Sequence, residues 1–472
     1  MRPLAEVSLL AADASPASVF PRERLAAVPA LAAAVAPQVD WPLVVALRRK
    51  ASDLITRRLA DATQDGAPPL SALDRRLLGR SVVRSVVAAH AARLGADGRA
   101  LWPVETERAY AIAVEDAIFG FGRLQPLFEI ADAENIEIHG YDSVVVQYAD
   151  GRRATHPPVA DSDEELVEAI RFLGESVTPA RPFDDAHPTM TLALGDRHRL
   201  HAIGFGLSFR PSIAIRQHTL VQVTLPDLVA GGTLTEDLAR LLHAAVLARK
   251  SIVISGDQGA GKTTLLRALI AAIPANERFG TLETDYELLT HLQPGRTNIL
   301  ALQARVGMGE TQDGHRLGEY SVADLIPEAL RQNLSRLVVG EVRGGEAGAM
   351  FEAMTAVSGS MSTTHSHSAS STIDRLASRV AQGGVLTIEE AYRQIAHHLH
   401  LLVHVRLVDE TWRGGVRTRL VSEVRQLTGG IEAGRPVTHL VYQADPAGGH
   451  PRFTPDPDFV AELEPFRSGW DD

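Results

Sequence analysis

The sequence predicts an α/β fold with a mostly parallel sheet, preceded by a smaller α+β domain and a helical N-terminal segment. Two observations carry this prediction. From about residue 235 onward, short apolar strands alternate with helices, as they do in parallel sheets with helices on both faces. Within that alternation, an apolar strand leads directly into a glycine-rich turn and then a helix, over residues 251–273.

The length, charge and cysteine content exclude several classes of protein. The chain has 472 residues, enough for several domains, with 47 Lys and Arg against 58 Asp and Glu, a formal net charge of −11. Because nucleic-acid-binding domains are usually basic, no direct nucleic-acid partner is expected. The absence of cysteine excludes disulfides and cysteine-ligated metals. There is no signal-peptide pattern and no run of about 20 apolar residues, so a cytoplasmic protein is expected.

The first half of the chain divides into segments that differ in composition and in the spacing of apolar residues. Residues 1–40 are rich in Ala and Pro and are expected to form a loose tail. Residues 41–119 place apolar residues three and four apart, which predicts helices whose role stays open. Residues 120–224 mix short β-branched runs with one amphipathic stretch, 163–176, and predict an α+β domain. Leu225–Gly232 reads as a linker.

Predicted helices and strands alternate in the second half of the chain. Residues 225–445 are expected to form the α/β domain, and 446–472, rich in Pro and Asp, a loose C-terminal tail. Each predicted helix precedes a strand: the helices are 238–247, 262–273, 324–333 and 345–357, and the strands are 251–255, 279–283, 337–339 and 360–364. Strand-like runs continue over 400–443, with a turn at Gly414-Gly415.

The most specific motif lies at 256–264, where the sequence matches G-x-x-x-x-G-K-[ST] between a strand and a helix. Glycines let the backbone curl until several N–H groups face one phosphate, and the following helix adds its positive end. The motif predicts ATP and Mg²⁺ as ligands, with the lysine on the β- and γ-phosphates and the Thr263 hydroxyl on the metal. The expected binding residues are Gly256, Asp257, Gln258, Gly259, Ala260, Gly261, Lys262, Thr263 and Thr264.

Hydrolysis also needs carboxylates that position metal and water, and two segments offer them. Glu341 follows the apolar strand Leu337–Val339 and Gly340. It is expected to orient water or to contact Mg²⁺, directly or through a water molecule. Glu283 ends another strand, with Glu287 four residues on. If a helical turn follows that strand, the two glutamates share a face.

A dense polar run, Ser362–Ser368, contains two histidines. His365 is the candidate for sensing the γ-phosphate or the attacking water. A metal site and a plain polar loop are the alternatives, although the only carboxylate near in sequence is Asp374.

Beyond the motif, these segments resemble the type II/IV secretion ATPases, and most closely the branch that powers Tad/Flp pilus assembly. The block 330–347, with Gly340-Glu341-Val342-Arg343-Gly344-Gly345-Glu346-Ala347 at its centre, resembles the family's Walker B region. Residues 362–365 resemble its His box and 278–288 its Asp box, while 120–127 and 214–216 resemble segments of its N-terminal domain. Thr284 stands where the family usually has Asp, and Ser366-His367 where it often has Ala-Asn.

The resemblance implies a RecA-like ATPase domain linked to the N-terminal domain, six copies in a ring, and ATP bound between the two domains. It implies that arginines of the N-terminal domain neutralise charge on the phosphate, and by position Arg199, Arg210 and Arg216 are the candidates. The catalytic set is then Glu341, Glu283, Glu287, His365 and these arginines. The implied function is a motor for pilus assembly or protein secretion, peripheral at the inner face of the membrane and acting on an integral inner-membrane partner.

Two other readings stay open. One is a conjugation-type ATPase for DNA transfer, which the acidic net charge disfavours as a direct DNA binder. The other is a nucleotide-binding scaffold that hydrolyses little, which Thr284 keeps open. ABC transporters and AAA+ unfoldases fit less well, since no LSGGQ-like signature is present and the strand ending at Gly340-Glu341 lacks an acidic pair.

Overall fold

The computed structural model divides into two compact units, 1–219 and 220–472, and each is described by itself. The residues whose structure is described are 39–64, 71–130, 132–177, 180–195, 197–218, 222–293, 295–305, 307, 311–312, 315–342, 344, 346–382, 384, 386–445 and 448–467. The loose tail expected over 1–40 therefore lies, up to residue 38, outside the described residues.

The first unit begins with three helices, α1 (Trp41–Gln64), α2 (Ala72–Ala96) and α3 (Val104–Phe119), as the apolar spacing predicts. Their buried residues recur three and four apart and form one small core, because that spacing places them on one helix face. This core contains Val44, Leu47, Ala51 and Ile55 of α1, Val82, Val83, Val86 and Val87 of α2, and Tyr110, Val114 and Ala117 of α3.

An antiparallel sheet with one long helix follows, in the order β3-β2-β1-β6-β5-β4. The helix, α5 (Asp163–Ser176), begins at the N-cap Ser162 and buries Leu166, Ile170 and Leu173 in the core it shares with the sheet. The remaining elements are η2 (Gly122–Leu124), α4 (Gln125–Phe128), β1 (Ala133–His139), β2 (Val144–Tyr148), β3 (Arg153–His156), β4 (Thr189–Leu194), β5 (His198–Ile203) and β6 (Ser212–Gln217).

The helical segment and the α+β segment touch within this unit. The guanidinium carbon of Arg48 lies 4.8 Å from the centre of the Phe172 ring, and that of Arg123 lies 5.7 Å from the Trp41 ring. Such cation–π contacts tie α1 to the α+β elements. The stretches 41–119 and 120–218 thus belong to one compact unit.

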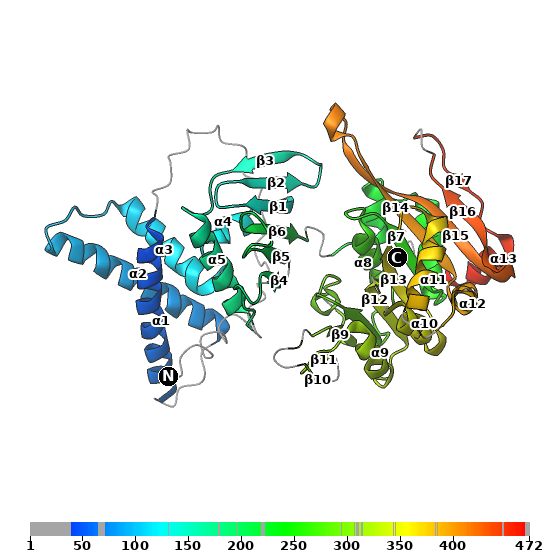
Figure 1. Ribbon diagram of the computed structural model, residues 1–472, viewed down its shortest axis with the longest axis horizontal. Helices are drawn as coiled ribbons and strands as arrows, with labels where there is room; N and C mark the ends of the chain where they lie inside the picture. The colour runs from blue at the N-terminus through cyan, green and yellow to red at the C-terminus, as the bar shows by residue number, and fades with distance from the viewer. Residues whose placement is uncertain are drawn as a thin grey trace. The chain divides into compact units, whose positions relative to one another are not determined.

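The second unit is built on a nine-stranded sheet with the order β17-β16-β15-β14-β7-β13-β12-β8-β9 (Figure 1). Neighbours from β14 to β9 pair in parallel, and β14 to β17 pair antiparallel. The predicted α/β class with a mostly parallel sheet is confirmed. The strands are β7 (Ile252–Gly256), β8 (Phe279–Glu283), β9 (Ile299–Gln303), β12 (Arg336–Val342), β13 (Met361–His365), β14 (Leu401–Asp409), β15 (Arg417–Glu432), β16 (Arg435–Gln443) and β17 (Arg452–Phe453).

Helices cover both faces of this sheet, and the central strand shows why. In β7, Ile252 and Ile254 join one core while Val253 joins the other, because successive side chains of a strand point to opposite faces. The first core includes α6 (Leu225–Ala230), α7 (Glu236–Leu247), α8 (Lys262–Ala271) and α13 (Pro457–Leu463). The second includes α9 (Val322–Leu330), α10 (Glu346–Ala356), α11 (Ala369–Gln382) and α12 (Ile388–His398).

The remaining short elements of this unit are η3 (Thr290–Leu292), β10 (Thr311–Gln312), β11 (His315–Arg316), η4 (Thr411–Arg413) and η5 (Glu464–Phe466). Among the described helices, none combines the length and the apolar character needed to span a bilayer.

The linker expected at 225–232 is wrong, since that stretch forms α6. Thr224 and Asp227 cap the helix reciprocally through their side chains and backbone N–H groups, and Pro226 sits in its first turn, where a missing N–H costs nothing. Leu225 and Leu228 are buried in the core. Pro226 is therefore part of a helix start.

The loose C-terminal tail expected over 446–472 is also wrong for its described part, 448–467. β17 pairs with β16, and α13 begins at the N-cap Asp456, whose carboxylate accepts two backbone N–H groups. Phe459 and Leu463, four residues apart, are buried in the same core as β7. An apolar pair at helical spacing thus outweighs the polar composition around it.

Candidate active site

The segment between β7 and α8 has the backbone curl of a phosphate-binding loop. Gly256, Gly259 and Gly261 have φ angles of +154°, +74° and +94°, which side-chain-bearing residues rarely adopt. A Cβ atom on Gly256 would lie 2.2 Å from the carbonyl oxygen of Val405 on β14. Both the torsions and the close strand approach therefore require glycine, as the motif predicts.

Lys262 is the first residue of α8, and its side chain turns into the loop. Only 7% of the residue is exposed. Its Nζ donates to the carbonyl oxygen of Asp257, 2.9 Å away, and lies 3.2 Å from Nδ1 of His365. The lysine and the histidine, predicted separately as site residues, are thus in direct contact.

His365 ends β13, and its other ring nitrogen faces Glu341 on β12. The distance from Nε2 to Oε1 of Glu341 is 2.8 Å. A continuous polar chain therefore runs from Lys262 through His365 to Glu341. It lies at the carboxyl ends of adjacent parallel strands, the edge where open α/β sheets bind their ligands.

A bulge directs Glu341 toward the histidine. Between Val339 and Val342, β12 holds one residue more than the strand β13 opposite. The hydroxyl of Thr363 donates to the carbonyl oxygen of Gly340 across a distance of 2.7 Å, so the carbonyl left out of the ladder is paired. The Gly340-Glu341 pair therefore stands outside the regular strand geometry.

Glu283 ends β8 and is 2% exposed. Its Oε2 accepts the N–H groups of Glu287, at 2.8 Å, and Leu288, at 2.7 Å, while Oε1 makes no hydrogen bond within the described residues. Burial raises the pKa of Glu283 to about 7, against the opposing effect of the two N–H donors. Gly340 makes room for it, since a Cβ there would lie 3.1 Å from Cγ of Glu283.

No helical turn follows this strand, so the condition under which the two glutamates would share a helix face is not met. Residues 284–289 bend around the Glu283 carboxylate, so the two glutamates meet through the backbone N–H of Glu287 and not through a shared helix face. The carbonyl oxygen of Glu287 accepts a 2.8 Å bond from Nε of Arg267 on α8. Thr284 is exposed.

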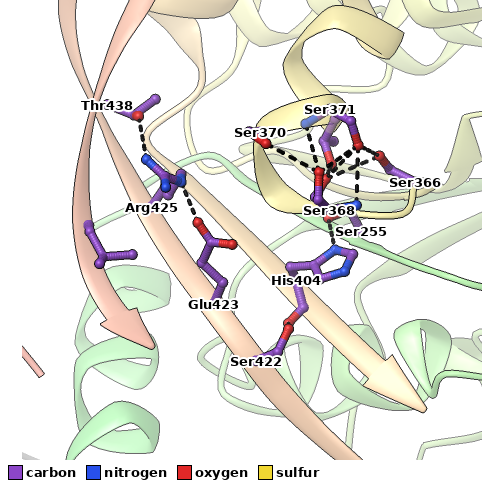
Figure 2. Close-up of polar contacts among 12 residues, drawn as sticks. Ser255, Ser366, Ser368, Ser370, Ser371, His404, Ser422, Glu423, Arg425 and Thr438 are labelled. Carbon is purple, nitrogen blue, oxygen red and sulfur yellow. Dashed lines mark hydrogen bonds and ion pairs between the residues drawn. The ribbon is translucent and has the colours of Figure 1, made fainter. Parts of the chain in front are cut away.

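A buried polar pair supports the loop from the side of β14. Nδ1 of His404 lies 2.9 Å from the hydroxyl of Ser255, and burial lowers the pKa of His404 (Figure 2). Figure 2 also shows the hydroxyl cluster at the start of α11, where Ser366, Ser368, Ser370 and Ser371 bond to one another. This cluster anchors the segment that follows His365.

The second histidine of the polar run has its own partner. Nδ1 of His367 lies 2.8 Å from Oδ1 of Asp257, and both side chains are exposed. Across the part of the chain that the structure describes, no three His, Asp or Glu side chains gather as a metal site needs. The metal alternative for this run has no support there.

The other predicted loop residues lie along the same turn. Asp257 and Gln258 are exposed, and Ala260 is fully buried. Thr263 and Thr264 are half-buried in the first turn of α8.

The three candidate arginines lie in the first unit. Arg199 on β5 is the register partner of Arg216 on β6. Arg210 bonds to both carboxylate oxygens of Asp163, each at 2.7 Å, and to Asp142 at 2.8 Å. The hydrogen bonds to Asp163 raise the pKa of Arg210 and lower that of the carboxyl group.

The sequence interpretation missed three residues that hold this site: Arg267, Thr363 and Arg419. Nε of Arg419, on β15, donates to the carbonyl oxygen of Gly259 at 2.9 Å. Thr363 lies in the polar run 362–368 but was not a candidate site residue, and Arg267 and Arg419 lie outside the motifs. The sequence signal for Arg419 is the alternation Arg417-Thr418-Arg419 in a strand-like run.

Comparison with known proteins places the chain in a family. A family model described as "Type II/IV secretion system protein" matches residues 158–427. A protein of Mycobacterium tuberculosis, provisionally described as a conjugal transfer protein, is 29% identical over 330 residues, 68% of this chain and 89% of that protein. Conjugal transfer protein TrbB of Rhizobium radiobacter is 30% identical over 213 residues, 44% of this chain and 61% of TrbB.

Among solved structures, the VirB11 ATPase from the Brucella suis type IV secretion system is 24% identical, covers 65% of this chain and 96% of its own, and has a TM-score of 0.34. The family model spans more than half of the 472 residues, including the phosphate-binding loop, Glu341 and His365. The chain belongs to the Type II/IV secretion system protein family.

Proposed function

We propose that this protein is an ATPase motor that drives pilus assembly or protein secretion through a membrane-embedded partner. The observation that carries the proposal is the convergence of Lys262, His365 and Glu341 beside the glycine loop. A lysine for phosphate, a polar relay and a terminal carboxylate are the parts that phosphoryl transfer to water requires. The assignment to the Tad/Flp branch rests on the sequence resemblance.

The loop fits a nucleoside triphosphate. Its glycines hold positive φ angles, and α8 presents its positive N-terminal end. The Nζ of Lys262 donates to a carbonyl oxygen of the same loop, so the ammonium group already lies where the loop curls. The chemistry of this donor set suits ATP as substrate.

The residues also fit Mg²⁺, because Thr263 and Glu341 offer the oxygen ligands this ion prefers. When bound, Mg²⁺ would neutralise charge between the β- and γ-phosphates. Around it, Glu341 orients the attacking water, and His365 fixes the direction of that carboxylate through the contact of 2.8 Å. Glu283 packs against Gly340 and holds the bend after β8 by accepting the N–H groups of Glu287 and Leu288.

The arginines of the first unit supply the remaining charge. Arg199 and Arg216 are register partners on adjacent strands, which brings two basic residues to one place on the sheet. We assign them to the phosphate of the same or a neighbouring subunit in a six-membered ring. The two carboxylates that hold Arg210 favour a structural role for that residue.

The motor acts at the inner face of the membrane.

The test of the motor is Mg²⁺-dependent phosphate release from the purified full-length chain over a range of protein concentrations. Wild type is compared with Lys262→Ala, Glu341→Gln and the control Lys50→Ala, which removes an exposed lysine from α1. A motor built from neighbouring subunits is supported if turnover per subunit rises with protein concentration. Turnover should also be lost in Lys262→Ala and Glu341→Gln but kept in Lys50→Ala. ATP binding without turnover in the wild type would instead support a scaffold.

A second candidate is a conjugation-type ATPase, because relatives with this resemblance are described as conjugal transfer proteins. The net charge of −11 disfavours direct contact with DNA. Stimulation of turnover by double-stranded DNA at low salt, lost at high salt, would favour this candidate over the pilus or secretion motor.

A further inference from the structure

The hairpin of β14 and β15 extends beyond the sheet beside the phosphate-binding loop. The last parallel pair between β14 and β7 is Val405 with Gly256, where β7 ends. β14 continues through Arg406–Asp409, paired antiparallel with residues 417–420 of β15. This projecting part of the hairpin forms a wall next to the loop.

Two arginines on one face of β15 meet the loop from this wall. Arg417 and Arg419 are two residues apart, so their side chains share a face of the strand. Besides the bond from Arg419 to the Gly259 carbonyl, a Cβ on Gly259 would lie 3.5 Å from Nη2 of Arg417. A Cβ on Gly261 would lie 3.4 Å from Cδ of Arg419. Both side chains therefore lie against the loop backbone.

Burial increases the strength with which the charge of Arg417 interacts with nearby groups. Its side chain is 8% exposed, and its Nε lies 3.7 Å from Oδ2 of Asp409. A charge screened from water acts more strongly on its neighbours than an exposed one, because the local dielectric constant is lower. The hairpin therefore brings a buried guanidinium group, with Asp409 as its neighbour, to a side of the loop that the motif residues do not occupy.

The strand order sets which end of a nucleotide this wall faces. β13 and β12, with His365 and Glu341, lie on one side of β7, while β14 and β15 lie on the other. A triphosphate with its γ-phosphate toward His365 and Glu341 turns its α-phosphate and nucleoside toward the hairpin. Residues on the β13 side of β7 thus face the γ-phosphate, and residues on the β14 side face the α-phosphate and the nucleoside.

We propose that Arg417 binds the α- and β-phosphates of the nucleotide, and that Arg419 is a positioning residue that fixes the loop through Gly259. This inference rests on the proposed function, since it needs a nucleotide in the loop. Both arginines then contribute to the affinity for ADP and ATP alike and little to the rate of the chemical step. Glu341 and His365, in contrast, act on the rate.

The test is titration of the full-length chain with ADP and with a non-hydrolysable ATP analogue, each with Mg²⁺, followed by steady-state turnover. In Arg417→Ala the Kd for both nucleotides rises about tenfold, as expected for loss of a charge-assisted hydrogen bond, while kcat at saturation changes less than about threefold. Arg417→Lys keeps the charge and most of the affinity. Arg419→Ala raises both Kd values and Arg419→Lys restores part of the loss.

The matched control is Arg413→Ala, on the turn of the same hairpin, where the arginine pairs with Glu410. It should bind both nucleotides as the wild type does. Thermal melting without nucleotide identifies any variant that fails to fold, and for Arg417 the lysine variant then carries the comparison. Kd values for Arg417→Ala and Arg419→Ala equal to those of Arg413→Ala overturn this inference alone. A wild type that binds no nucleotide overturns the proposed function as well.

Discussion

Nζ of Lys262 lies 3.2 Å from Nδ1 of His365, whose Nε2 lies 2.8 Å from the carboxylate of Glu341. An ammonium group can only donate hydrogen bonds, so Nδ1 accepts from Lys262, and Nε2 is the ring nitrogen that faces the carboxylate. The two contacts line up Lys262, His365 and Glu341 beside the phosphate-binding loop. Residues from three elements act as one unit.

Replacement of His365 should slow turnover and leave binding nearly intact. His365→Ala frees the Glu341 carboxylate, so kcat should fall by about a hundredfold, the usual range for a lost positioning or proton-relay group. The Kd for ADP should change less than about threefold, because Lys262 keeps its loop contacts. Phosphate release and ADP titration measure the two effects. The control is His367→Ala, on the exposed second histidine. Equal turnover in both variants would contradict the relay.

Glu283 should make stability depend on pH. Its pKa is about 7 in the folded chain, above the ordinary value of 4.5, so between these values the folded state keeps a proton that the unfolded state has lost. The contribution of Glu283 to stability is therefore fully present below pH 4.5 and is lost as the pH rises to about 7. Relative to Glu283→Gln, the wild type should lose up to about 3 kcal/mol of unfolding free energy across this window.

Urea titrations at several pH values measure the unfolding free energy of each protein. The contributions of other ionisable groups cancel when the value for Glu283→Gln is subtracted from that of the wild type. The control is Glu328→Gln, which neutralises an exposed glutamate on α9. Parallel stability curves for wild type and Glu283→Gln between pH 4.5 and 7 would show that the carboxyl group is not held protonated.

Arg336 and Glu277 should form a stabilising pair at the opposite edge of the sheet. Arg336 is fully buried, with Nε 2.8 Å and Nη2 3.1 Å from the carboxylate of Glu277, and Nη1 donates to the carbonyl of Val246. Arg336→Ala leaves a buried carboxylate without its main partner and should cost about 3–5 kcal/mol.

Denaturant unfolding measures this cost. The control Arg331→Ala removes an exposed arginine paired with Glu328 and should cost less than about 1 kcal/mol. The double variant Arg336→Met with Glu277→Gln should recover part of the loss, because no unpaired charge remains. A loss below about 1 kcal/mol in Arg336→Ala would mean that the pair contributes nothing.

The sequence predicts the central part of the fold well because β7 and α8 have both a strong pattern and a specific motif. The apolar run 252–254 is buried on both faces, and the helix after Lys262 follows at once, so pattern and structure agree. Glu283 and His365 end β8 and β13, and Glu341 is the last residue but one of β12. Each position was predicted for the same reason, because a polar residue follows a short apolar or small-residue run.

The parts that were missed depend on contacts between distant residues. α6 and α13 are short helices whose capping residues, Thr224 and Asp456, stand among prolines, and composition alone reads such stretches as loops. The bend after Glu283 follows from a buried carboxylate that accepts two backbone N–H groups, a tertiary effect with no periodic signal. Arg419 reaches Gly259 across 160 residues of sequence, which only the pairing of β14 with β7 brings together.

The most direct test of the account is the identity of the nucleotide held by Glu341→Gln. The variant and the wild type are incubated with ATP and Mg²⁺, separated from free nucleotide, denatured and analysed by ion-exchange chromatography. We expect intact ATP on the variant and ADP on the wild type, because Lys262 and the glycine loop bind while Glu341 serves hydrolysis. ADP on the variant, formed at the wild-type rate, would contradict the role of Glu341. Intact ATP on the wild type would contradict the ATPase itself.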